Sequence, residues 1–224
     1  MVALSSGRPK VVSKFIEKLH FPIAYNNSLF TGKTTLMCEL IRHRDEKFNT
    51  KIKRIIYLYS YLSKDLLDLK KKNDDMFLVN NIDAALNLIV TDSLLILDDQ
   101  ICSLKNKPFI DKITELFVAT VHHKKCSVYL LLQNLYFCAA VRTLALNSGL
   151  LLLMNCVRDK TIAMSVAKAF SPHNTRFVLD AYKKAILSKQ RGYLVIDLSQ
   201  DTPERFRLTN SLGPSSDMEV YVEI

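Results

Sequence analysis

Residues 92–100 read DSLLILDDQ, in which four aliphatic residues are followed by two adjacent carboxylates. A short, continuous apolar run of this kind is typical of a strand covered on both faces of a parallel sheet. Ligands of such sheets bind outside the carboxyl ends of the strands. The run therefore predicts a buried strand that delivers Asp98 and Asp99 to a ligand-binding edge.

Similar apolar runs recur along the chain, separated by segments with helical periodicity. The predicted strands, besides Leu94–Leu97, are Ile55–Tyr59, Val128–Leu132, Leu150–Met154, Tyr193–Ile196 and a weaker one around Phe21–Tyr25. The predicted helices are Thr34–Phe48, Ile110–His122, Asp159–Phe170 and Asn174–Leu187. This βαβ order predicts a three-layer α/β/α domain with a mainly parallel central sheet. Lys70–Asp75, with the sequence KKKNDD, is expected to be an exposed loop.

The composition is that of one globular domain, since 49% of the 224 residues are apolar and 24% are charged. The formal charge of +9 suits an anionic partner such as nucleic acid, with a basic solvated surface as the alternative. Five cysteines without a CxxC pair argue against a disulfide framework and a zinc site. No apolar run has the length of a secretory signal or of a membrane span, which takes roughly 20 residues. We therefore expect a soluble, intracellular protein.

A second motif lies upstream, where residues 30–36 read FTGKTTL and open an amphipathic helix. Gly32 would let backbone amides approach phosphates, and Lys33 would reach the β- and γ-phosphates of a nucleotide. Thr34 would hold Mg²⁺, and the amino terminus of the helix would add a partial positive charge. We count Thr35 with the same phosphate-binding residues. On its own, GKTT is equally compatible with a chance helix start.

The beginning of this loop departs from the usual phosphate-loop pattern, GxxxxGK[ST]. That pattern places a glycine five positions before Gly32, where this chain has Asn27. Asn is the non-glycine residue that best tolerates positive φ, so a loop conformation is still accessible. Phe30 stands at a position that is usually small, and its ring could crowd the phosphates. These two residues are the reason to keep a catalytically silent protein as an alternative.

Taken together, the two motifs predict one nucleotide site. Asp98 would hold Mg²⁺, directly or through water, in partnership with Thr34, as in a Walker B element. Asp99 would orient the attacking water and help to deprotonate it. The alternative is that both acids cap the turn after the strand. The presence of GKTT upstream favours the nucleotide site.

A third polar group follows the predicted strand Val128–Leu132 and consists of the amides Gln133 and Asn134. An amide at the end of the strand beside the Walker B strand can bond the γ-phosphate or the attacking water. Gln133 is therefore the candidate sensor of nucleotide state.

With these motifs in place, the sequence resembles the FtsK/HerA superfamily of DNA translocases. Within it, the likeness is closer to the genome-packaging ATPases of poxvirus-like viruses and of Polinton/Maverick elements. The resemblance runs from about Gly32 to about Asn210. Its most diagnostic segments are HHKKCSVYLLLQN (122–134), RTLALNS (142–148), NCVRDK (155–160) and GYLVIDLSQDTPERFRL (192–208).

This resemblance implies a RecA-like P-loop ATPase of the additional-strand type. By the same resemblance, its oligomeric ring uses ATP and Mg²⁺ to drive double-stranded DNA into a preformed capsid. The residues carried over are Gly32, Lys33 and Thr34 for phosphate and magnesium, Asp98 and Asp99 for Walker B, and Gln133 as the sensor. Implied partners are further copies of the chain and capsid or portal proteins, without a membrane, at a viral assembly site in the host nucleus or cytoplasm. We expect an extension at 1–20, the ATPase domain at 21–210 and a loose tail at 211–224.

Two arginines follow strands and could reach the nucleotide of a neighbouring subunit. Arg142 follows the sensor strand and Arg158 follows the next strand, so either is a candidate arginine finger. A surface salt bridge or a contact with DNA phosphate is the alternative for both. We include Arg142 among the candidate catalytic residues. The pair Lys124–Lys125 could also contact DNA phosphates.

Two other classes of function stay open from the sequence. A catalytically silent DNA-binding or assembly protein descended from such an ATPase would fit Asn27 and Phe30. A small-molecule kinase or GTPase fits less well, because the chain has no NKxD guanine motif and no extended lid. Binding and hydrolysis of ATP with Mg²⁺ distinguish the silent protein from a motor.

Overall fold

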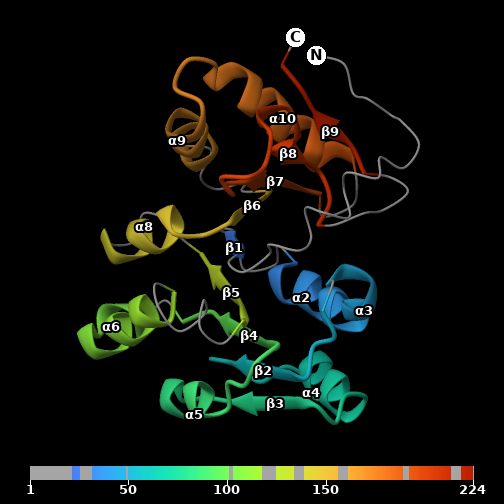
Figure 1. Cartoon of the computed structure of the whole chain (residues 1–224), viewed down its shortest axis with the longest axis vertical. Coiled ribbons are helices and arrows are strands. Elements are labelled where there is room, and N and C mark those ends of the chain that lie inside the picture. The colour runs from blue at the N-terminus through green and yellow to red at the C-terminus, as the bar shows by residue number, and fades with distance from the viewer. Residues whose placement is uncertain are drawn as a thin grey trace.

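The strands form one sheet, which runs through the middle of the molecule (Figure 1). This computed structural model describes residues 22–25, 32–48, 50–100, 103–117, 125–133, 139–155, 161–188, 192–212 and 218–223. The strand order in these residues is β3-β2-β4-β5-β1-β6-β7-β8-β9. The strands from β3 to β6 in this order are parallel, and β7, β8 and β9 are added antiparallel. The predicted, mainly parallel sheet is therefore confirmed.

The parallel strands are β1 (Pro22–Tyr25), β2 (Arg54–Leu58), β3 (Met76–Val79), β4 (Ser93–Asp98), β5 (Ser127–Leu132) and β6 (Leu150–Met154). The antiparallel strands are β7 (Tyr193–Asp197), β8 (Leu208–Thr209) and β9 (Val220–Tyr221). The strand β5 lies between β1, which precedes the phosphate loop in the sequence, and the acid-bearing strand β4. This insertion is the additional-strand arrangement.

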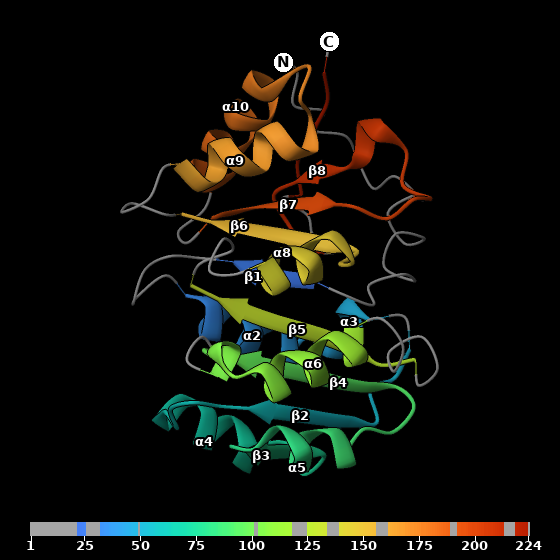
Figure 2. The same cartoon turned by 90° about the vertical axis from the view of Figure 1, so that its left-hand side faces the viewer.

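Helices cover both faces of the sheet, as Figures 1 and 2 show. On one side lie α2 (Lys33–Arg42), α3 (Arg44–Lys47) and α4 (Lys64–Lys71). On the other side lie α5 (Ile82–Asn87), α6 (Lys107–Glu115), α8 (Ala139–Leu146) and α9 (Thr161–Phe170), with α10 (Thr175–Ser188) packed on α9. The predicted three layers are confirmed. No helix in the described part of the chain is both long and apolar enough to cross a membrane.

The strand β4 shows why a continuous apolar run forms the centre of this fold. Leu95 and Leu97 belong to the core on the side of α5 and α6, whereas Leu94 and Ile96 belong to the core beneath α2 and α4. Successive side chains of a strand point to opposite faces, so a strand between two helical layers must be apolar at every position. All four side chains are completely buried. Their burial fixes the position of β4 in the sheet, so Asp98, its last residue, lies at the carboxyl end of the strand and Asp99 follows it.

The prediction of βαβ order throughout is wrong for the last part of the sheet. The connection from β6 to β7 contains two helices, α9 and α10. A single crossover helix returns the chain to the end of the sheet at which the previous strand began, so the next strand runs parallel to it. Here the second helix carries the chain back to the end of the sheet at which β6 finished, and Met154 is therefore paired with Tyr193. β7 runs antiparallel to β6 for this reason.

Several predicted boundaries also differ from the structure. The expected helix Thr34–Phe48 breaks at His43 into α2 and α3, and the expected loop Lys70–Asp75 begins inside α4. The prediction of a loose tail at 211–224 is wrong at Val220–Tyr221. These two residues form β9, which pairs with β8, and the ring of Tyr221 is buried. The other domain boundaries stay predictions.

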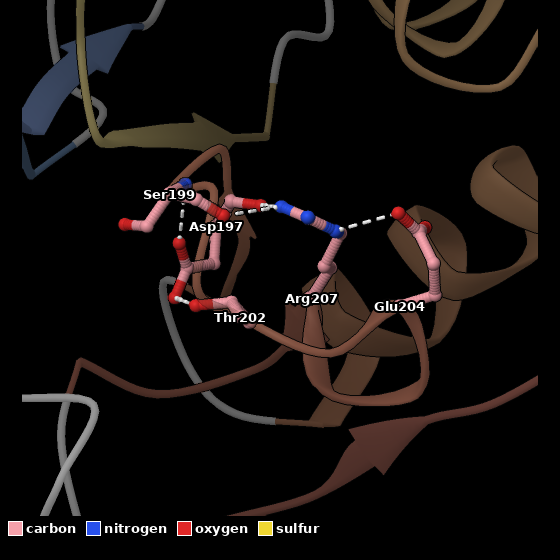
Figure 3. A network of polar contacts seen from close by, with 5 residues as sticks. All are labelled: Asp197, Ser199, Thr202, Glu204 and Arg207. Atoms are coloured by element: carbon pink, nitrogen blue, oxygen red, sulfur yellow. Dashed lines mark hydrogen bonds and ion pairs between the residues drawn. The ribbon is translucent and has the colours of Figure 1, made fainter.

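A closed polar network holds the turn between β7 and β8 (Figure 3). The carboxylate of Asp197 accepts hydrogen bonds from the amide of Ser199 and the hydroxyl of Thr202, each at 2.8 Å. The guanidinium of Arg207 donates to the carbonyls of Asp197 and Ser199 and pairs with Glu204. Side chains therefore satisfy the backbone groups that this turn leaves open.

Gly192 lies where the chain passes closely beneath the end of α10 before β7. A Cβ atom at this position would come within 2.3 Å of the carbonyl oxygen of Ala185 and 2.6 Å of that of Ile186. Because both contacts are with backbone, we expect Gly192→Ala to lower the free energy of unfolding by about 1–3 kcal/mol. Urea unfolding measures this as a lower midpoint with an unchanged slope. An unchanged midpoint would contradict the close approach.

Candidate nucleotide site

Five predicted site residues meet at the carboxyl ends of β4 and β5, beside the amino terminus of α2: Lys33, Thr34, Asp98, Asp99 and Gln133. Gly32 precedes the helix with a φ of 84°, in the left-handed region that glycine adopts without strain. The helix starts at Lys33, so its free amide groups and its dipole face this edge of the sheet. A helix start at the carboxyl ends of parallel strands is where phosphates bind in α/β folds.

Lys33 is the buried cation of the site. Its side chain is buried, and its ammonium group donates a hydrogen bond of 3.2 Å to the carbonyl of Leu132, the last residue of β5. Burial lowers the pKa of Lys33, while the charges of Asp98 and Asp99 oppose that shift. An ammonium group that has lost much of its water gains strongly from a bound polyanion.

Thr34 and Asp98 are brought together, although they are far apart in the sequence. The hydroxyl of Thr34 donates to Oδ2 of Asp98 at 3.0 Å. The hydroxyl of Tyr57 donates to the same oxygen at 2.6 Å. The carboxylate at the end of β4 is thus held by the first turn of α2 on one side and by β2 on the other.

Burial raises the pKa of Asp98, and the hydrogen bonds from Tyr57 and Thr34 and the charge of Lys33 act against that rise. A hydroxyl and a carboxylate in contact are hard oxygen ligands of the kind that Mg²⁺ takes, together with substrate phosphates and water. The donor set therefore fits a magnesium ion that is completed by a nucleotide.

Asp99 points to the neighbouring strand. Its carboxylate accepts a hydrogen bond of 2.6 Å from the side-chain amide of Gln133, and its backbone has a φ of 51°. The hydroxyl of Ser60 donates to the carbonyl of Asp99 at 2.8 Å, and the amide of Gln100 donates to Ser60 and to the carbonyl of Asp98. The unusual backbone conformation at Asp99 is fixed by these contacts.

The remaining predicted residues are less closely engaged. Thr35 lies half-buried in the first turn of α2, and Arg142 is exposed on α8. Asn27, Phe30, Asn134, Arg158 and Lys124 lie outside the described residues.

Three residues of the site were not predicted from the sequence. They are Tyr57, Ser60 and Gln100, of which Tyr57 lies within the predicted strand Ile55–Tyr59. The signal for Tyr57 is its place on the strand next to β4, in register with Ile96. Ser60 and Gln100 carried no signal, because a polar residue after a strand is ordinary turn composition.

No protein-family model matches the sequence, and no curated protein matches it significantly. The structure is similar to that of the genome packaging NTPase B204 from Sulfolobus turreted icosahedral virus 2 in complex with sulfate. That match has a TM-score of 0.54 and 17% identity, over 83% of this chain and 94% of that chain. The complex of B204 with AMPPCP matches with a TM-score of 0.52 and 16% identity, over 92% of this chain and 100% of that chain.

A further similar structure is B204, the DNA-packaging ATPase from Sulfolobus Turreted Icosahedral Virus. It matches with a TM-score of 0.52 and 15% identity, over 91% of this chain and 98% of that chain. At these identities the likeness shows the fold. This chain therefore has the α/β fold of the P-loop ATPases.

Proposed function

We propose that this protein is the ATP-hydrolysing subunit of a motor that moves double-stranded DNA into a viral capsid. One observation carries the enzymatic part of the proposal. Lys33, the Thr34–Asp98 pair and the Asp99–Gln133 pair gather around the start of one helix, at one edge of the sheet. A site of this composition provides a cation for phosphates, oxygen ligands for Mg²⁺ and a carboxylate for water.

Each residue then has a chemical task. The ammonium of Lys33 binds the β- and γ-phosphate oxygens, and the amides at the start of α2 bind the same anion. Thr34 and Asp98 would hold Mg²⁺, which neutralises charge on the transferred phosphoryl group. The carboxylate of Asp99 orients the attacking water. The side-chain amide of Gln133 donates one N–H to Asp99, and its second N–H would donate to a γ-phosphate oxygen.

The DNA-moving part of the proposal is supported by charge and by fold. The formal charge of +9 favours an anionic partner, and the similar structures are described as a genome packaging NTPase and a DNA-packaging ATPase. Arg142 is exposed on α8 and is available to a neighbouring subunit, as a ring motor requires of an arginine finger. We propose a homo-oligomeric ring, with capsid or portal proteins as partners, working at an intracellular site of viral assembly.

Binding of ATP with Mg²⁺ is expected to stabilise the folded chain. A ligand present at 100 times its Kd adds about 2.7 kcal/mol to the free energy of unfolding, which thermal unfolding records as a higher Tm. ATP turnover, measured with and without double-stranded DNA, is expected to be higher with DNA.

Three outcomes separate the possible functions. Binding and turnover that DNA stimulates support the motor. Binding without turnover supports a silent protein derived from such an ATPase. A folded chain whose Tm does not respond to ATP and Mg²⁺ at millimolar concentration overturns the nucleotide site itself.

A further inference from the structure

Tyr57 lies at the centre of the site without being one of the expected motif residues. It is on β2, in register with Ile96 of β4, and its side chain is completely buried. Asp98 is two residues beyond Ile96 and therefore points to the same face of the sheet. Diagonal neighbours on adjacent strands are within reach of a long side chain. The phenol of Tyr57 thus reaches the carboxylate of Asp98 from the strand beside it.

The hydrogen bonds at Asp98 are unevenly distributed between its two oxygens. Oδ2 accepts from Tyr57 at 2.6 Å and from Thr34 at 3.0 Å. Within the described part of the chain, no hydrogen bond to Oδ1 is formed. Two donors on one oxygen fix the rotation of the carboxylate, so the second oxygen is presented in a defined direction.

We propose that Tyr57 is a positioning residue that holds the carboxylate of Asp98 in the orientation needed to bind the magnesium of a bound nucleotide. This role rests on the proposed function, since it concerns the same site. Thr34 cannot supply the whole constraint, because its hydroxyl is itself a candidate ligand of the ion. Tyr57 is the donor that comes from outside the phosphate loop, and it keeps Asp98 oriented when Thr34 turns to the metal.

The chain contains a matched control for this role. Tyr129 is on β5, is also completely buried on the α2 side of the sheet, and has no hydrogen-bond partner for its hydroxyl among the described residues. Tyr57→Phe and Tyr129→Phe remove the same atom from equivalent buried surroundings. Only the first removes a hydrogen bond to Asp98.

The experiment is an isothermal titration calorimetry measurement, in which Mg²⁺ is titrated into each variant at a fixed concentration of ATPγS. We expect Tyr57→Phe to weaken the apparent Mg²⁺ affinity by about 10-fold, as loss of a partner of a metal ligand does. Binding of ATPγS in EDTA, which depends on Lys33 and the helix start, should be unchanged in this variant. Tyr129→Phe should match the wild type in both measurements.

The results that overturn the proposal are distinct from those that overturn the function. Equal Mg²⁺ affinity in Tyr57→Phe and the wild type shows that the hydroxyl serves packing or folding alone. Equal losses of binding with Mg²⁺ and in EDTA show a general distortion of the site. A wild-type chain that binds no ATPγS under either condition overturns the nucleotide site, and the role of Tyr57 with it.

Discussion

Lys33→Ala is expected to reduce ATP turnover by about 10²–10³-fold or more, the loss seen when one preorganised donor to a reacting oxyanion is removed. The effect should be large because Lys33 is a buried cation in a site that holds two carboxylates. Without its ammonium group, only the bound Mg²⁺ and the amides at the start of α2 would offset the repulsion between a triphosphate and the carboxylates of Asp98 and Asp99. Binding of ATP should weaken together with turnover.

Lys53→Ala is the matched control for this prediction. Lys53 is mostly exposed and forms a salt bridge of 2.8 Å with Asp92, which precedes β4 and so lies at the opposite end of that strand from Asp98. Exposed ion pairs contribute little to stability, so this variant should fold and turn over ATP like the wild type. Wild-type turnover in Lys33→Ala would contradict the assignment of Lys33, provided that the Lys53 variant is also active.

The core of this fold could be predicted because the information is local. The apolar run Leu94–Leu97 has no polar position, so it had to be a strand buried on both faces, and the acids after it had to lie at the sheet edge. The same reasoning located β2, β5 and β6. Gln133 and Asp99 were placed near one another because both follow strands, and they are hydrogen-bonded.

The parts that could not be predicted depend on tertiary context. β3 lies at an edge of the sheet, and its apolar run, MFLV, has only four residues, which is too short to be told from one turn of a helix. The direction of β7 depends on how α9 packs on α10, which no periodicity encodes. A tyrosine that donates a hydrogen bond to a carboxylate on the neighbouring strand cannot be distinguished in the sequence from an ordinary strand residue.

Asp99→Asn is expected to reduce the rate of ATP hydrolysis by about 10²–10⁴-fold while ATP binding is retained, because a positioned base contributes roughly this much. The substitution is mild for the structure. Asn tolerates the left-handed backbone that Asp99 adopts at a φ of 51°, and its oxygen can still accept the hydrogen bond from Gln133. What it removes is the negative charge that attracts the proton of the attacking water.

Asp92→Asn makes the same chemical change under the same backbone constraint at the other end of β4. Asp92 also has a positive φ, of 64°, but it pairs with Lys53 away from the site. If the loss in Asp99→Asn came from strain in a left-handed turn, Asp92→Asn should share part of it. If it comes from the lost base, only Asp99→Asn should lose turnover, measured as kcat with ATP saturating. Full turnover in Asp99→Asn would instead move the role of base to another group and leave Asp99 as a partner of Gln133 alone.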